Sequence, residues 1–157
     1  LEVDLETKFE PIIDSETGNF TLYVKTTQPG YTPCTLTARM EGKKDSVLHL
    51  IIENSTTEAE YTSRAWAPEY NDLKANPDLH NGRIFVFEGT VKDIIALGDK
   101  SSFIVDIANG AQSPQLIFVE CWENMTIRSE SKIRLFGNRW GNHEGIPRIL
   151  AKYIYRY

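Results

Sequence analysis

The stretch Gly82-Arg-Ile-Phe-Val-Phe-Glu-Gly-Thr-Val-Lys-Asp93 decides which fold the rest of the chain predicts. Its apolar residues alternate with polar ones, so that Phe85, Phe87 and Val91 lie on one face of an extended chain. A period of two is typical of a β-strand with one buried face. Gly89 falls on the same face, and a glycine inside a strong strand commonly marks a bulge or a barrel corner. We therefore expect one long strand that bends sharply at Gly89.

Four more strand-like runs follow this stretch, which is enough to close a small barrel. They are predicted at Ser101–Ile107, Gln115–Cys121, Ser131–Trp140 and Pro147–Tyr155. Residues 122–130 are expected to form a helical turn or a loop, and residues 141–145 a second loop. A long, bent first strand, with a short element between the third and fourth strands, is the layout of an OB-fold barrel.

One short helix is predicted immediately before the barrel, over Ala67–Pro77. A proline near the start, acidic residues in the first turn and a proline at the end are typical of a short, well-delimited helix. Tyr70, Leu73 and Leu79 are expected to face a neighbouring element.

Residues 1–65 predict a separate, small β-region. Strands are expected at Asn19–Thr27, Pro33–Met40, Ser46–Glu53 and Glu58–Trp66. The first two of these are expected to pair with each other, and short strands separated by turn signals fit a small antiparallel sheet or sandwich. The sequence thus predicts an all-β protein with a small antiparallel β-region over residues 1–65, followed by a five-stranded OB-fold barrel with one short helix over residues 66–157.

The charge of the chain argues against a protein that grips nucleic acid by its phosphates. The net charge is −5; residues 1–66 hold 11 acidic and 6 basic side chains, and residues 67–157 hold 11 of each. Phosphate binding usually needs a basic surplus. At the outward positions of the second and third barrel strands, Leu116 and Phe118 are accompanied by carboxylates and by no Lys or Arg. We expect the N-terminal half to cover these two residues, and we keep single-stranded nucleic acid only as the alternative ligand.

Composition is that of an ordinary folded protein, with 41% hydrophobic and 25% charged residues. The apolar runs are far shorter than the roughly 20 residues that span a bilayer. The chain opens on Leu1 rather than Met, a start that suggests a trimmed or processed chain from which a signal or anchor is missing. Cys34 and Cys121 lie among apolar and β-branched neighbours; two buried thiols are the favoured reading, and a disulfide is the alternative.

Motifs for catalysis or metal binding are absent from the sequence. His49, His80 and His143 lack a second ligand at helical or strand spacing, and the chain has no Gly-rich phosphate loop, no nucleophile elbow and no His-Glu-x-x-His. We therefore predict a non-enzymatic binding or interaction module that uses no cofactor and no metal.

The best candidate for a binding site is the segment between the fourth and fifth barrel strands, because OB-folds often bind ligands with this loop. The candidate ligand-binding residues are Arg139, Trp140, Asn142 and His143, together with Phe118 and Leu116 on the third strand. Trp and Arg are frequent interface anchors, and Asn and His add hydrogen bonds. The alternative is a hairpin tip whose tryptophan packs back on the barrel.

Four motifs of the barrel half resemble a known family. They are Tyr70-Asn-Asp-Leu-Lys-Ala-Asn-Pro-Asp-Leu-His-Asn-Gly82, Phe87-Glu-Gly-Thr-Val91, Lys132-Ile-Arg-Leu-Phe-Gly137 and Gly145-Ile-Pro-Arg-Ile-Leu-Ala-Lys-Tyr-Ile154. Residues 66–157 resemble the predicted OB-fold proteins of Gram-positive bacteria grouped as "tRNA-anticodon-binding-like". The chain departs from the family around Glu130, where many relatives carry a Gly-Asp turn.

The resemblance implies an extracellular or cell-surface protein of unknown function, held at a membrane only through an anchor that this chain lacks. The partner would be a protein or a glycan. The nucleic-acid part of the family's name is an analogy of fold, which is weak support for a function.

Overall fold

The structure is a computed structural model that describes residues 2–3, 12–13, 16–17, 20–21, 28–39, 41–108, 110–123 and 125–157. In this part of the chain the strands β1 (Glu2–Val3), β2 (Ile12–Ile13) and β3 (Phe20–Thr21) are short. The predicted strand Asn19–Thr27 lies outside the described residues except at β3. None of the helices in the described part is long and apolar enough to cross a membrane.

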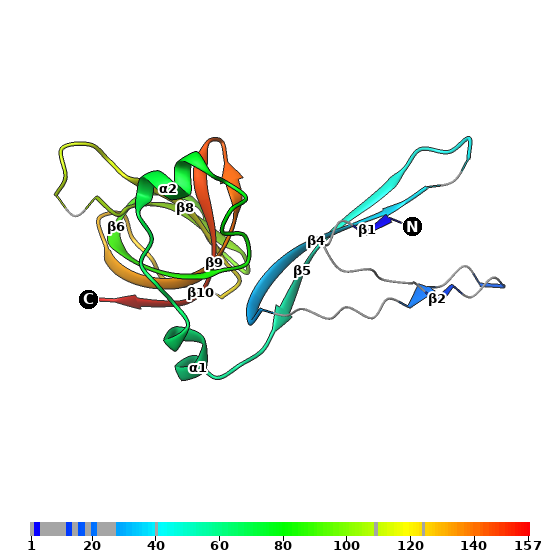
Figure 1. The fold of residues 1–157 in the computed structure, drawn as a ribbon, viewed down its shortest axis with the longest axis horizontal. Coiled ribbons are helices and arrows are strands. Elements are labelled where there is room, and N and C mark those ends of the chain that lie inside the picture. The colour runs from blue at the N-terminus through cyan, green and yellow to red at the C-terminus, as the bar shows by residue number, and fades with distance from the viewer. Residues whose placement is uncertain are drawn as a thin grey trace.

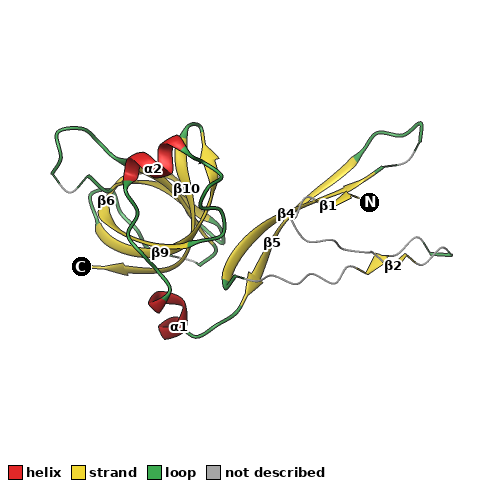
Figure 2. Cartoon of the chain, in the orientation of Figure 1, coloured by secondary structure: helices red, strands yellow, loops and turns green. Residues whose placement is uncertain are grey.

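Residues 84–156 form a closed barrel of five strands (Figures 1 and 2). The strands are β6 (Ile84–Ala96), β7 (Ser101–Asp106), β8 (Leu116–Cys121), β9 (Lys132–His143) and β10 (Ile146–Arg156). Their order around the barrel is β10-β8-β7-β6-β9, with β8 and β10 parallel and the other neighbours antiparallel. A first strand that pairs with the second and the fourth, and a third that pairs with the fifth, define the OB-fold, so the predicted fold class is confirmed.

The bend of β6 closes the barrel. Residues 84–90 of β6 pair with β9, and β6 pairs with β7 from Thr90 onward, so that one strand serves both sides of the barrel wall. Gly89 lies at this transfer, and a Cβ there would come within 2.4 Å of the backbone oxygen of Asp106. A side chain would therefore prevent the approach of β7, as the sequence predicts.

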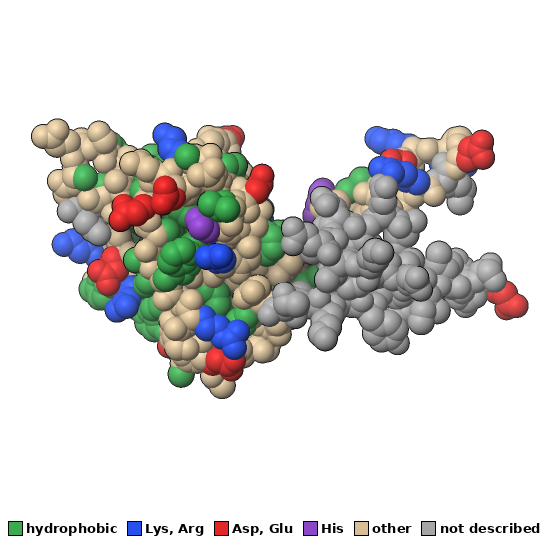
Figure 3. Space-filling view, viewed as in Figure 1, with side chains coloured by type: hydrophobic (Ala, Val, Ile, Leu, Met, Phe, Trp, Pro, Cys, Tyr) green, Lys and Arg blue, Asp and Glu red, His purple; other side chains and the backbone are tan. Residues whose placement is uncertain are grey.

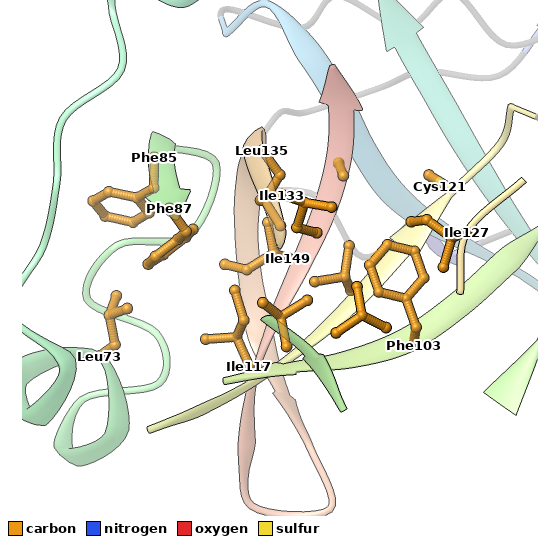
Figure 4. Close-up of a cluster of buried hydrophobic side chains, with 14 residues drawn as sticks. Leu73, Phe85, Phe87, Phe103, Ile117, Cys121, Ile127, Ile133, Leu135 and Ile149 are labelled. Atoms are coloured by element: carbon orange, nitrogen blue, oxygen red, sulfur yellow. The ribbon is translucent and has the colours of Figure 1, made fainter. Parts of the chain in front are cut away.

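The core lies inside the barrel (Figure 4). Phe85, Phe87 and Val91 of β6 are all buried, which confirms the predicted inward face. Burial of each such side chain stabilises the fold by about 1.5 to 3 kcal/mol. Cys121 belongs to this cluster, and both cysteines of the chain are buried thiols that form no disulfide with each other, as favoured from the sequence.

The short helix before the barrel is confirmed as α2 (Tyr70–Ala75), which closes one end of the barrel with the fully buried Leu73. The expectation for Leu79 is wrong, because its side chain is 65% exposed. Asn76 ends the helix before Pro77, so Leu79 lies in the following turn and not on the apolar helical face.

The predicted strand Glu58–Trp66 is wrong, because Glu58–Ser63 form a helix, α1. The Thr57 side chain accepts a hydrogen bond from the backbone N–H of Glu60 at 3.2 Å, and Glu60 pairs with Arg64 one turn later at 2.6 Å. Thr57-x-x-Glu60 is the sequence of a capping box, so a start signal for a helix outweighs the polar alternation that suggested a strand.

The predicted loop over residues 141–145 is shorter than expected. Strand β9 continues to His143 and β10 starts at Ile146, which leaves Glu144 and Gly145 as a two-residue turn. Both have positive φ, 50° and 80°, as a tight hairpin turn of the primed type requires. The segment 122–130 contains no helical turn among its described residues.

A second sheet of order β1-β4-β5 projects from the barrel (Figure 1). Strand β4 (Gly30–Ala38) and strand β5 (Ser46–Asn54) form a nine-pair hairpin. The predicted pairing of β4 with the preceding strand is wrong, because β3 pairs with β2, and β4 lies between β1 and β5. Only a short connection separates Ala38 from its partner Ser46, and an Arg39–Asp45 ion pair at 3.1 Å lies beside it, so pairing with the following strand closes a small loop.

Gly30 offers a test of how closely this hairpin packs on the barrel. Both Gly30 and Gly42 have positive φ, but a Cβ at Gly42 meets open space, whereas one at Gly30 would lie 2.0 Å from Oδ1 of Asn138. We expect Gly42→Ala to lower the free energy of unfolding by about 1 to 2 kcal/mol from backbone strain alone. Gly30→Ala adds overpacking, for a total of roughly 2 to 5 kcal/mol.

Urea unfolding followed by tryptophan fluorescence measures both losses. Equal losses in the two variants would contradict the close packing of Gly30 on the barrel.

Candidate functional site

Arg139 is not exposed, contrary to the expectation for a binding loop. It is fully buried, and its guanidinium donates hydrogen bonds to the backbone oxygens of Leu73 (3.3 Å) and Arg148 (3.4 Å) and to Oδ1 of Asn142 (2.7 Å). Burial lowers the pKa of Arg139 to about 10, against the opposing charge of Asp78. Arg139 therefore ties α2 to the hairpin of β9 and β10, and Asn142 helps to hold it there.

Trp140 packs against the N-terminal sheet. Its ring N–H donates a 2.7 Å hydrogen bond to the backbone oxygen of Tyr31 in β4. Its six-membered ring lies about 3.5 Å from where a Cβ on Gly82 would be. Trp140 thus joins β4 to the barrel. The sequence left two alternatives, a ligand-binding tryptophan and one that packs back on the barrel, and this role lies between them.

Phe118 and His143 are brought together by the barrel. Their rings stack at a centroid distance of 3.8 Å and an interplanar angle of 18°. Phe118 is only 4% exposed, and the ring stacked on it comes from the end of β9, whereas the sequence predicts cover by the N-terminal half. Leu116 is partly exposed, and its backbone oxygen accepts a hydrogen bond from the hydroxyl of Tyr70 at 3.1 Å. A ligand-binding role for these residues stays a prediction.

An ion cluster around the buried Glu120, on the outer face of β8, was missed in the sequence. The carboxylate of Glu120 lies 2.5 Å from Nζ of Lys100 and 2.5 Å from Nε of Arg148. Lys100 belongs to the β6–β7 connection, and Arg148 to β10, which pairs in parallel with β8. The expectation that this face carries no Lys or Arg is therefore wrong, because barrel closure brings them from distant parts of the sequence.

The cations control the protonation of Glu120. Burial raises the pKa of the carboxyl, but the hydrogen bonds and charges of Lys100 and Arg148 outweigh burial and hold the pKa below its ordinary value. Glu120 is thus an anion that compensates two cations.

Aromatic rings and cations continue this cluster toward the N-terminal sheet. Lys100 lies 5.5 Å from the ring centre of Trp122, and Trp122 lies 5.2 Å from Tyr31. Lys152, only 8% exposed, pairs with Glu53 of β5 at 2.7 Å and lies 5.5 Å above Tyr31. Burial, followed by the charge of Glu53, raises the pKa of Tyr31 to about 12. These contacts form a seam between hairpin and barrel.

The outer part of the hairpin is exposed and apolar. Val47 is 51% exposed, Leu48 53% and Leu50 38%, although their strand is the most apolar of residues 1–65. Leu48 faces Leu36 across the hairpin and Leu50 faces Cys34, and both β4 partners are buried. Hydrophobic side chains are visible on this projection, beside the basic side chains near its tip (Figure 3).

Acidic, His and Cys side chains do not gather into a metal site in the described part of the chain, where no group of three or more could hold an ion. His49 lies on the hairpin with its Nδ1 3.1 Å from Oγ1 of Thr35, and His80 packs between the rings of Trp66 and Phe85.

Comparison with known proteins adds little to this geometry. No family model and no curated protein matches the chain. Among solved structures, the chain is similar to one in a replication protein A heterotrimer bound to single-stranded DNA, with 17% identity and a TM-score of 0.39. The alignment covers 63% of this chain and 76% of that one. A TM-score of this size carries no argument, so the OB-fold assignment rests on strand order and closure, and the family resemblance stays a prediction.

The Glu120 cluster predicts a specific dependence of stability on pH. Because the folded pKa is lowered, Glu120 stabilises the fold fully above its ordinary pKa, near 4.5, and this contribution is lost as the pH falls through the folded value. We expect Glu120→Gln to cost about 1 to 3 kcal/mol at pH 7, because Arg148 then lacks its charged partner. The cost should shrink at pH 3, and urea unfolding at both pH values measures it.

Glu130→Gln is the matched control. Glu130 pairs with Lys92 at 3.2 Å, but both side chains are exposed, so the variant should change stability by at most about 1 kcal/mol. If Glu120→Gln lowers the free energy of unfolding as much at pH 3 as at pH 7, the charge role of Glu120 is contradicted.

Proposed function

We propose that the protein is a non-enzymatic binding module whose hairpin of β4 and β5 captures an extended segment of a partner protein. One observation carries this proposal: β5 is a terminal strand of its sheet, and it exposes Val47, Leu48 and Leu50. An extracytoplasmic location, implied by the family resemblance, belongs to the same proposal.

An exposed apolar edge strand is a template for pairing. In the described part of the chain, β5 pairs with β4 and with no other strand, so one row of its backbone N–H and C=O groups is open. Extended peptides bind such edges through main-chain hydrogen bonds, and alternate side chains give specificity. Leu48 and Leu50, two positions apart, supply apolar contacts on one face.

The charged residues of the hairpin determine which charge an end of the partner segment carries. Lys43 and Lys44 lie at the exposed tip, and the neighbouring Asp45 already pairs with Arg39. The inner end of β5 is held by the Glu53–Lys152 ion pair. We therefore favour a segment with alternating apolar residues and an acidic end that lies beside Lys43 and Lys44.

The barrel acts as a rigid support for this arm. The hairpin is joined to it by the Trp140 hydrogen bond, the Lys152 ion pair and the aromatic contact of Tyr31 with Trp122. A strand edge that is held in place loses little conformational entropy on binding, which favours affinity.

Titration with a designed peptide tests the hairpin. We expect Ac-Asp-Thr-Val-Thr-Val-Thr-Asp-NH₂ to shift the amide NMR resonances of β5 saturably, because its alternation matches the open edge. Leu48→Lys should weaken this binding about tenfold or more, because one buried apolar contact of roughly 1.5 kcal/mol is lost.

Leu97→Lys is the control, since Leu97 is as exposed as Leu48 (both 53%) but lies on the barrel. An equal effect of both variants, or no saturable shift, would contradict the proposal. Sedimentation velocity completes the test, because dimerisation that Leu48→Lys abolishes would make a second copy of the chain the partner.

A second candidate function is the binding of single-stranded nucleic acid on the β7–β8 face. The observation that favours it is that Lys100 lies over the ring of Trp122, and that Arg148 is the register partner of Phe118, on whose ring His143 stacks. Aromatic rings beside basic groups are the elements of such sites.

Trp fluorescence with short single-stranded DNA or RNA, at about 50 and about 200 mM salt, tests this second candidate. Binding that falls steeply with salt and weakens in Lys100→Ala would support it. Because the neutral balance of the barrel half argues against phosphate binding, we expect no saturable binding at either salt concentration.

A further inference from the structure

A hollow of about 210 Å³ lies in the barrel wall beside β6. It is lined by the segment that leads into α2, by the first half of β6 and by the ends of the β7–β8 connection. None of its lining residues belongs to β5 or to the Glu120 cluster, so the hollow is independent of both binding surfaces discussed above.

The hollow exists because a strand pairing stops there. Trp66 forms a parallel bridge beside β6: its N–H donates to the oxygen of Ile84 at 3.4 Å, and its oxygen accepts from the N–H of Val86 at 3.1 Å. The next residue in register is Pro68, which has no N–H and cannot continue the ladder. On the same edge, β7 pairs with β6 only from Thr90 onward.

The interruption leaves one open position on β6. Because the N–H of Val86 points toward Trp66, the oxygen of Val86 and the N–H of Glu88, two residues on, point to the same side. Among the described residues, no strand pairs with β6 on this edge between the bridge of Trp66 and Thr90. One donor and one acceptor at this spacing are what a single residue of a parallel strand requires.

The other residues that line the hollow determine which kind of ligand it favours. Pro68 and Ile107 are apolar, and Asn71 and Gln115 carry amides. Of the two carboxylates, Glu88 already faces Arg134 at 3.6 Å, so Glu69 is the acid that favours a cation. The volume is below the roughly 300 Å³ at which drug-sized sites begin, and suits one amino-acid residue.

We propose that this hollow binds one residue of an extended peptide, whose main chain takes the open position between Val86 and Glu88 and whose basic side chain reaches Glu69. The peptide continues the parallel pairing that Trp66 begins and Pro68 ends. The aliphatic part of a Lys or Arg side chain then packs on Pro68 and Ile107.

An NMR titration of the full chain with N-acetyl-lysine N-methylamide tests the proposal. We expect saturable shifts of the Val86 and Glu88 amides. Glu69→Gln should weaken binding about two- to fivefold, as the loss of one exposed charge pair does. Ala67→Phe fills the hollow and should abolish the shifts. Ala111→Phe, at an exposed position outside the hollow, should leave them intact.

Three outcomes would overturn the proposal. No saturable shift at Glu88 would show that the open position takes no peptide. Equal shifts with n-butylammonium would assign the hollow to free amines, and equal affinity for N-acetyl-glutamate N-methylamide would remove the role of Glu69. Leu48→Lys, which tests the hairpin, should leave this titration unchanged, so the two proposals fail separately.

Discussion

The side-chain amide of Asn138 connects β9 to three other segments of the chain through hydrogen bonds. Its oxygen accepts hydrogen bonds from the backbone N–H of Tyr31 (3.0 Å) and the hydroxyl of Tyr61 (2.6 Å). Its nitrogen donates to the backbone oxygens of Pro29 and Gly82, both at 3.0 Å. The residue is 1% exposed, so an unpaired amide there would be costly, and all four of its hydrogen bonds are made. One side chain of β9 thus joins the start of β4, the helix α1 and the entry to β6.

The residues packed around Asn138 have little conformational freedom. Gly30 must lack a side chain because its Cβ would overlap Oδ1 of Asn138 and the ring of Tyr61. Tyr61 is fully buried against Tyr153, and burial raises the pKa of its hydroxyl so that it stays a donor. Because Tyr31 is fixed by its N–H, its oxygen and ring are also placed, and Trp140 and Lys152 can reach them. The orientation of the hairpin follows from these contacts.

Local patterns account for the parts of the fold that were predicted correctly. The alternation around Phe85 and the position of Gly89 concern neighbours in sequence, and they fixed β6, its inward face and its bend. Helix α1 was missed even though Thr57-x-x-Glu60 carries a start signal. The candidate site was harder, because its contacts join distant segments: Arg139 meets Leu73, and Glu120 meets Lys100 and Arg148, only once the barrel has closed.

The same reasoning separates structural from functional residues in this barrel. Trp, Arg, Asn and His at the end of β9 have the composition of an interface, but all four use polar groups or rings in internal contacts: Arg139, Trp140, Asn142 and His143. In the part of the chain that the structure describes, the unpaired strand edges lie elsewhere, at β5 and at the interrupted pairing of β6 beside Pro68, and composition does not reveal them. Both are strand edges. Extended chains bind such edges through main-chain hydrogen bonds, and this is the physical basis that the two peptide-binding proposals share.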